Sequence, residues 1–326
     1  SLKTTMPAAE RALELVRRTR QGIRDILHGR DSERLLVIVG PCSIHDADAA
    51  FEYARRLQAV AEAVRDRLLI VMRTYVQKPR TALGWKGLAS DPYLDGSCDV
   101  AAGLTLARRI LGAINELGVP CASELLDPFT ASYVADLLSW AAIGARTSSS
   151  QTHREMASGL EMPVGFKNST DGDLAAAVNG VLCSSRSQTA LGIDDTGVVS
   201  AWRTAGNRDG HIVLRGGATG PNHEAGDVAR ASALLGADPC ARPILIDCSH
   251  DNSGKDHTRQ PRVFREVIAL HRGGVNAIMG ALVESNLRAG NQSWRPGAAL
   301  AYGVSITDAC IGWEETEEML YEAAAG

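Results

Sequence analysis

The sequence predicts an α/β protein that closes into a (β/α)8 TIM barrel with an N-terminal helical extension. Short apolar runs rich in Val, Ile and Leu alternate with helical patterns, which is typical of parallel strands buried on both faces. Eight such runs occur, the number that closes a barrel of this class. Reactive side chains follow nearly all of them. We expect residues 1–326 to form one domain, with residues 1–34 as the helical extension.

The segment before the first strand is predicted to be an amphipathic helix. Leu15, Val16, Ile23 and Ile26 recur at near-helical spacing among arginines, and Gly29 follows as a stop signal. We expect the apolar face of this helix to pack on the main body.

The predicted strands share their short length and their apolar, often β-branched, composition. They are residues 35–39, 69–75, 119–124, 141–146, 163–167, 211–215, 243–249 and 277–284. An open doubly wound sheet would show the same alternation, so periodicity alone leaves both architectures open.

The residues at or just after the strand ends favour the barrel. In a barrel they surround one mouth, whereas in an open sheet they would be strung along an edge. The alternative explanation is that loops simply begin with polar residues, which suits any single position better than all of them together. These residues are Cys42, Arg73, Glu124, Arg146, Lys167, Arg215, His250 and Glu284.

Two connections are longer than a strand-to-helix link requires. Residues 76–98 combine Pro and Gly with two lysines and an arginine, which indicates an ordered substrate loop. Residues 182–210 contain alternating apolar residues around the turn sequence Asp195, Thr196, Gly197. This pattern predicts a β-hairpin inserted after the fifth strand-helix unit.

Composition sets limits on partners and compartment. The formal net charge is -4 and hydrophobic residues make up 45% of the chain, so the sequence predicts neither a nucleic-acid nor a membrane partner. The seven cysteines show no CxxC pairing, which indicates a reducing compartment. No apolar run has the length of a signal peptide core or a membrane span, so we expect a cytoplasmic protein.

A candidate metal site combines one thiol, one imidazole and two carboxylates from distant parts of the chain. These are Cys42, His250, Glu284 and Asp308. Such mixed ligands suit Mn, Fe, Co or Zn better than Mg or Ca. No short-range ligand spacing supports the set, so a buried core cysteine and a structural histidine remain the alternative.

A second set consists of cations at strand ends or in the long loop. Buried cations without partners are too costly to keep, so a polyanionic ligand would explain them. Salt bridges to the 38 acidic residues of the chain are the alternative. The set comprises Arg73, Lys78, Arg80, Arg146, Lys167 and Arg215.

Several long motifs resemble the microbial type I synthases of 3-deoxy-D-arabino-heptulosonate 7-phosphate (DAHP), and the resemblance runs in order from about residue 10 to 320. They include GPCSIHD (40–46), KPRTALGWKG (78–87), PVGFKNSTDG (163–172), DCSHDNSGK (247–255) and VESNLRAGNQS (283–293). The resemblance implies a transferase that condenses phosphoenolpyruvate with erythrose 4-phosphate in the first step of the shikimate pathway. It also implies one divalent metal ion and a homodimer or homotetramer.

The resemblance assigns roles by motif. The implied metal ligands are Cys42, His250, Glu284 and Asp308. The implied substrate-binding residues are Arg73, Lys78, Pro79, Arg80, Thr81, Glu124, Ala145, Arg146, Lys167, Arg215 and Asp308. The implied catalytic residues are Lys78 and His250 as proton carriers, Glu124 beside the reacting carbons, and Lys167.

Three positions depart from the family pattern beside the expected site. Gln77 precedes KPRT where an acidic residue is usual, Ser149 replaces a glutamate, and Asp251 replaces an alanine next to a predicted metal ligand. These departures leave open a paralogue of specialised metabolism that takes another aldose phosphate or aldehyde. A catalytically silent barrel that serves as a binding partner is the third possibility.

Overall fold

A closed barrel of eight parallel strands forms the centre of the computed structural model, which describes residues 2–80, 84–194, 197–236, 238 and 240–325. Around the barrel the strands follow the order β1-β10-β9-β8-β5-β4-β3-β2. The barrel prediction is therefore confirmed, and the open-sheet alternative is wrong. The strands are β1 Leu35–Gly40, β2 Leu68–Arg73, β3 Cys121–Glu124, β4 Trp140–Ile143, β5 Val164–Lys167, β8 Gly210–Leu214, β9 Ile244–Asp247 and β10 Ile278–Glu284.

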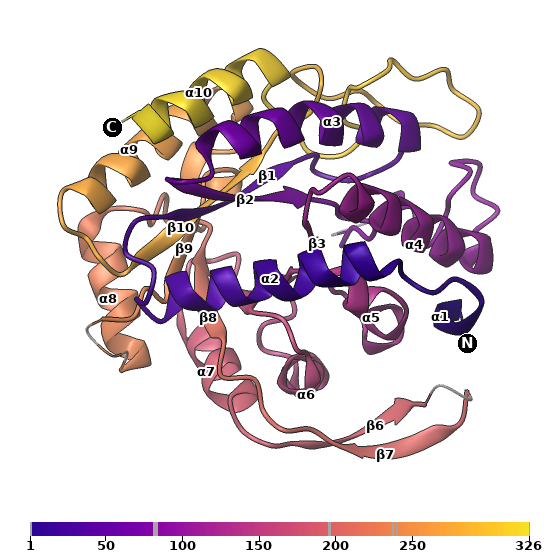
Figure 1. Ribbon diagram of the computed structural model, residues 1–326, viewed down its shortest axis with the longest axis horizontal. Helices are drawn as coiled ribbons and strands as arrows, with labels where there is room; N and C mark the ends of the chain where they lie inside the picture. The colour runs from indigo at the N-terminus through magenta and orange to yellow at the C-terminus, as the bar shows by residue number, and fades with distance from the viewer. Residues whose placement is uncertain (1, 81–83, 195–196, 237, 239, 326) are drawn as a thin grey trace.

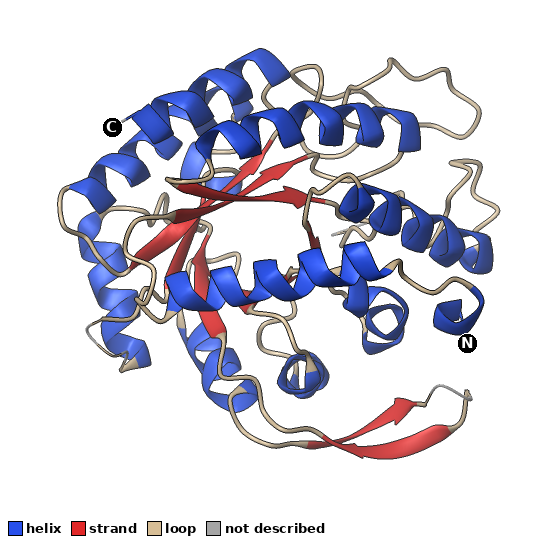
Figure 2. Cartoon of the chain, in the orientation of Figure 1, coloured by secondary structure: helices blue, strands red, loops and turns tan. Residues whose placement is uncertain are grey.

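Helices alternate with these strands and cover the outside of the barrel (Figure 2). Several begin at an aspartate whose carboxylate accepts backbone N–H bonds; Asp46, for example, accepts from Asp48 at 2.9 Å. The α-helices of the ring are α3 Ala47–Val64, α4 Val100–Glu116, α5 Pro128–Val134, α6 Gln151–Gly159, α7 Ala175–Ser184, α8 Ala225–Leu235, α9 Gln260–Arg272 and α10 Trp313–Ala325. Short 3-10 turns lie at Ala135–Leu137, His250–Ser253 and His257–Arg259.

Some strands end earlier than predicted. β4 stops at Ile143 because the next residue, Gly144, starts a turn: its carbonyl accepts from the N–H of both Thr147 and Ser148 at 3.0 Å. Arg146 therefore lies in the loop after β4 and not on the strand.

The N-terminal helical extension closes one end of the barrel. It comprises α1 Leu2–Thr5 and the long helix α2 Glu10–Leu27, which crosses the barrel opening in Figure 1. Ile23, Ile26 and Leu27 of α2 pack against barrel residues such as Leu36 and Trp140 in one buried cluster. Since α2 occupies the end where the strands begin, the opposite end, where they finish, stays available for a site.

The inserted hairpin lies where it was predicted. β6 Thr189–Ile193 pairs antiparallel with β7 Val199–Arg203 between α7 and β8, and the pair extends away from the barrel (Figure 1). Two residues of the predicted turn, Asp195 and Thr196, lie outside the described residues. Within the described part of the chain, no helix is long and apolar enough to cross a membrane.

Candidate active site

A cavity of about 890 Å³ opens at the end of the barrel where the strands finish. It brings together side chains from strand ends and loops throughout the chain, as the barrel prediction required. Of the predicted site residues, those that line it are Lys78, Pro79, Arg80, Glu124, Ala145, Arg146, Lys167, Arg215, His250, Glu284 and Asp308. Cys42 and Arg73 are fully buried and do not line the cavity, and Thr81 lies outside the described residues.

Three of the four predicted metal ligands form one cluster. The thiol of Cys42 and the carboxylates of Glu284 and Asp308 offer ligand atoms that all lie within 4.8 Å of one another. His250 lines the same cavity but is not part of this cluster. One sulfur and two carboxylate oxygens fit a borderline divalent metal ion.

Lys78 lies beside this cluster. Its Nζ lies 3.0 Å from Sγ of Cys42 and 3.6 Å from Oδ2 of Asp308. Burial opposes the charge of Lys78, but the carboxylates of Asp308 and Glu284 outweigh burial and raise its pKa, so the ammonium is protonated at neutral pH. In return Lys78 lowers the pKa of Asp308.

The thiol of Cys42 keeps its proton in this surrounding. Burial raises the pKa of Cys42 well above its ordinary value, and Glu284 adds to the shift. The thiol donates to Oδ2 of Asp308 at 3.3 Å. A metal ion at the cluster would have to replace this proton, because the thiolate is the ligand form of cysteine.

Arg73 lies beneath the cavity beside Glu284. Its Nη2 donates to Oε1 of Glu284 at 3.0 Å, and its guanidinium lies 3.9 Å from the ring centroid of Tyr75. Its Nη1 is buried and has no hydrogen-bond partner among the residues that the structure describes. Because such a group is costly to leave unsatisfied, it marks a place for an anionic ligand or water.

Asp247 is a site residue that the sequence reasoning missed. Its carboxylate is fully buried and accepts from Nζ of Lys167 at 2.9 Å and from Oγ of Ser249 at 2.6 Å. Burial opposes its charge, but Lys167 and His250 keep its pKa well below the ordinary value. Its position at the end of β9, three residues before His250, was the available signal.

Asp247 also orients His250. Nδ1 of His250 lies 3.0 Å from Oδ2 of Asp247 and 2.7 Å from Oγ of Ser249. When Nδ1 carries the proton toward the carboxylate, Nε2 is left as the acceptor or ligand atom. The backbone of His250 adopts a positive φ of 54°, which places the side chain at a strained turn.

Glu124 and Lys167 come from neighbouring parts of the barrel wall. Glu124 ends β3 and is 5% exposed, and a side chain at Gly144 would collide with its carboxylate. The absence of a side chain at Gly144 thus leaves room for the Glu124 carboxylate in its present position. Lys167 ends β5, and Asp247 overcomes the effect of burial to raise its pKa, so it is a second buried cation of the wall.

Only one of the three departures from the family pattern faces the cavity. The amide of Gln77 donates to Asp127 at 2.7 Å and to Thr130 at 3.0 Å, at the start of α5. Neither Gln77 nor the exposed Ser149 lines the cavity, whereas Asp251 does. Of the three departures, only Asp251 therefore changes the lining of the cavity.

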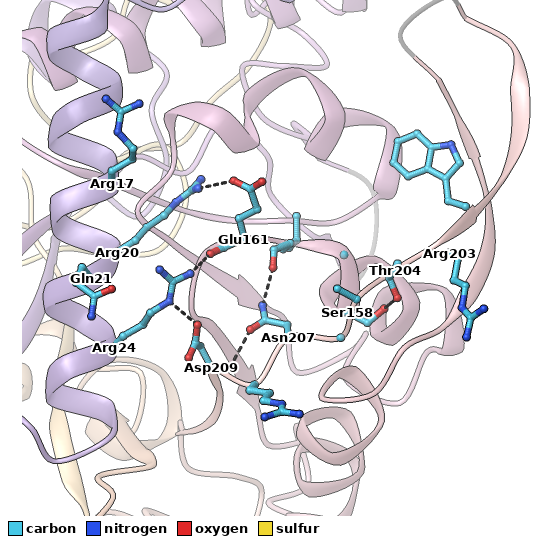
Figure 3. Close-up of a pocket in the computed structure, with 16 residues that line it drawn as sticks. Arg17, Arg20, Gln21, Arg24, Ser158, Glu161, Arg203, Thr204, Asn207 and Asp209 are labelled. Atoms are coloured by element: carbon cyan, nitrogen blue, oxygen red, sulfur yellow. Dashed lines mark hydrogen bonds and ion pairs between the residues drawn. The ribbon is translucent and has the colours of Figure 1, made fainter.

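A second cavity, of about 850 Å³, lies at the other end of the barrel beside α2 (Figure 3). Arg20 of α2 pairs with Glu161 at 3.1 Å, and Arg24 pairs with Asp209 at 2.6 Å. These bonds cross from α2 to the loops that precede β5 and β8 and hold the extension on the barrel. None of the predicted site residues that the structure describes lines this cavity.

Comparison with known proteins assigns the chain to a family. A profile described as the DAHP synthetase I family matches residues 7–321. The chain belongs to the DAHP synthetase I family.

Relatives within the DAHP synthetase I family cover nearly the whole chain. The chain is 49% identical to the Tyr-sensitive phospho-2-dehydro-3-deoxyheptonate aldolase of Escherichia coli (strain K12), over 98% of its own length and 90% of the relative. It is 48% identical to the Phe-sensitive enzyme of the same strain, over 99% and 92%. The protein is thus an enzyme of the DAHP synthase type.

A solved structure agrees with this assignment. The phospho-2-dehydro-3-deoxyheptonate aldolase of Francisella tularensis SCHU S4 superposes with a TM-score of 0.96 at 44% identity, covering 99% of this chain and 94% of the other. The barrel of this DAHP synthase and the family resemblance of its sequence are therefore both confirmed.

Proposed function

We propose that the protein condenses phosphoenolpyruvate with erythrose 4-phosphate to give DAHP and inorganic phosphate, using one divalent metal ion. The observation that carries the proposal is the meeting of a thiol-carboxylate cluster with a wall of buried cations in one cavity. Both reactants are polyanions, and a cleft lined with Lys and Arg suits them. The names of the relatives, which describe the phosphorylated heptulosonate product, support the same reaction.

Cys42, Glu284 and Asp308, joined by His250 through Nε2, would hold the metal ion. When bound, the ion supplies Lewis acidity to the aldehyde oxygen of the acceptor. The thiol and imidazole favour Mn, Fe, Co or Zn over Mg or Ca.

Phosphoenolpyruvate would lie against the wall of the cavity formed by β5 and the loops after β4 and β8. Lys167 and Arg215 face it from β5 and the loop after β8, and Arg146 and Ala145 from the loop after β4. Their charges would stabilise the carboxylate and the phosphate, and Arg73 would reach the same ligand through its unsatisfied Nη1. Glu124 would position the water that adds at C2 before phosphate leaves.

The acceptor would lie at the other side, with its phosphate on the segment Lys78, Pro79, Arg80 and Thr81. Carbon–carbon bond formation leaves negative charge on the former aldehyde oxygen, which needs a proton. Lys78 holds its proton at neutral pH and lies beside the metal cluster, so it is the assigned donor. His250 is the second candidate for this proton transfer.

Loss of phosphoenolpyruvate, measured with a panel of aldehydes, tests this proposal. We expect the highest kcat/KM with erythrose 4-phosphate. A paralogue of specialised metabolism would instead turn over another aldose phosphate or aldehyde and leave erythrose 4-phosphate unused. A silent binding barrel would show no turnover with any acceptor and no binding of phosphoenolpyruvate in a titration.

A further inference from the structure

Arg215, one of the cations proposed to bind phosphoenolpyruvate, already forms a salt bridge with the carboxylate of Asp251. Oδ2 of Asp251 lies 2.5 Å from Nη1 of Arg215, and both side chains line the cavity. We propose that Asp251 is an internal counter-anion: it occupies Arg215 in the ligand-free site and is displaced by the phosphate group of the substrate, so that it sets the affinity of this subsite. The inference rests on the proposed function.

The salt bridges of Lys167 and Arg73 lack this property. Asp247, the partner of Lys167, is fully buried and also accepts from Ser249, so it is fixed in place. Glu284, the partner of Arg73, is 2% exposed and belongs to the predicted metal cluster. Neither carboxylate is free to leave its cation when an anion arrives.

Asp251 has both an accessible position and a second partner. Its side chain is 19% exposed, and its Oδ1 lies 3.5 Å from Nζ of Lys255, whose own side chain is 73% exposed. A carboxylate that releases Arg215 can therefore keep an ion pair by turning toward Lys255. The loss of the first pair is partly offset in this way.

The backbone keeps the pair in place before any ligand binds. The N–H of Asp251 donates to the carbonyl of Arg215 at 3.2 Å. Gly216 has a φ of 74°, and a Cβ there would lie 2.6 Å from the backbone nitrogen of Asn252. The loops after β8 and β9 are thus in direct contact. Replacing the Asp251 carboxylate by a phosphate group beside Arg215 then requires only a rotation of the Asp251 side chain.

Electrostatics determine whether removing the charge of Asp251 strengthens or weakens phosphate binding. A phosphate group beside Arg215 shares the guanidinium with the Asp251 carboxylate and is repelled by it. Asp251→Asn keeps the shape of the side chain but removes the negative charge that competes with the ligand for Arg215. Phosphate and phosphoenolpyruvate should then bind more tightly. A merely structural role for Asp251 would predict the opposite, because disturbing the loop would weaken binding.

Isothermal titration calorimetry of the Mn²⁺-loaded protein with inorganic phosphate tests the inference without any turnover. We expect D251N to lower the Kd for phosphate about three- to tenfold, and the KM for phosphoenolpyruvate in parallel. The control is D256N, because Asp256 pairs with Arg259 at 3.2 Å and does not line the cavity. It should change neither constant by more than about twofold.

An unchanged or weaker affinity for phosphate in both D251N and Asp251→Ala, with the folded state intact by circular dichroism, overturns the inference. Failure of the proposed function would look different. In that case erythrose 4-phosphate would not support loss of phosphoenolpyruvate in the unaltered protein, whatever the phosphate titrations gave.

Discussion

The thiol of Cys42 and the carboxylate of Asp308 are 266 positions apart in the chain, yet Sγ lies 3.3 Å from Oδ2. The contact joins the loop after the first barrel strand to the segment before α10, so it exists only because the barrel closes. Together with Glu284 these residues make the cluster on which the metal proposal depends.

Replacing Cys42 tests that cluster. We expect Cys42→Ala to lose the bound metal and to lower turnover at least about 100-fold, since even residues that only orient metal ligands cost about 10–100-fold. Turnover with added manganese and metal content per chain are the measurements. The control is Cys121→Ala, because this thiol is equally buried but lies in the outer core. Full activity of Cys42→Ala beside an active control would refute the metal assignment.

The contacts of Arg20 that hold α2 on the barrel lead to a prediction about stability. The Arg20 guanidinium donates to the carbonyls of Leu138 at 3.0 Å and Ala135 at 2.7 Å, and its side chain is 9% exposed. Arg20→Ala removes this donor from both carbonyls, although the carbonyl of Ala135 keeps a bond from the N–H of Leu138 at 3.2 Å. We therefore expect the substitution to lower the free energy of unfolding by about 1–3 kcal/mol.

Urea unfolding measures the effect of Arg20→Ala against a control on the same helix. Arg17 is 55% exposed, and its ion pairs among the described residues are with Glu10 and Glu14 of α2, so Arg17→Ala should cost no more than about 0.5 kcal/mol. Equal losses in the two variants would show that Arg20 does not hold the helix on the barrel.

The barrel interior contains a histidine that makes stability depend on pH. Nε2 of His211 accepts from the indole N–H of Trp140 at 2.9 Å, and burial lowers the pKa of His211 to about 4 from the ordinary 6.5. The neutral form is favoured in the folded state. Stability from this group is therefore complete above pH 6.5 and is lost as pH falls toward 4, because the unfolded chain binds the proton first.

Urea unfolding at pH 7 and at pH 4.5 measures this loss. We expect the unaltered protein to lose about 2 kcal/mol more than His211→Gln over this interval, since each unit of pKa shift corresponds to about 1.4 kcal/mol. The glutamine keeps an acceptor for Trp140 but cannot titrate. Parallel losses in the two proteins would contradict the assignment of the pH dependence to His211.

The fold could be predicted from the sequence because its signals are local. Each barrel strand is an apolar run of its own, and the number of runs together with the polar residues after them favoured closure. Strand ends were less accurate, as at Ile143, because the turn that starts at Gly144 depends on hydrogen bonds that no apolar pattern records.

The candidate site could be predicted only in part for a related reason. Strand-end position indicated Glu124 and Lys167, but nothing local indicates that Asp247 fixes Lys167 or that Arg215 meets Asp251. The first pair joins β5 to β9 across the intervening β8, and the second joins the loops after the neighbouring strands β8 and β9, so both require the order of strands in the closed barrel. The family motif likewise placed Gln77 beside the expected site, but no local pattern indicates that its amide is bonded to the start of α5.

Phosphate release from phosphoenolpyruvate in the presence of erythrose 4-phosphate, before chelation, after chelation and after return of Mn²⁺, tests the central claim most directly. Metal analysis of each sample confirms how much ion is bound. We expect release to fall to the level without acceptor when the metal is removed and to recover when Mn²⁺ is restored. An undiminished rate in protein free of bound metal, or no release with erythrose 4-phosphate in the metal-loaded protein, would contradict this expectation.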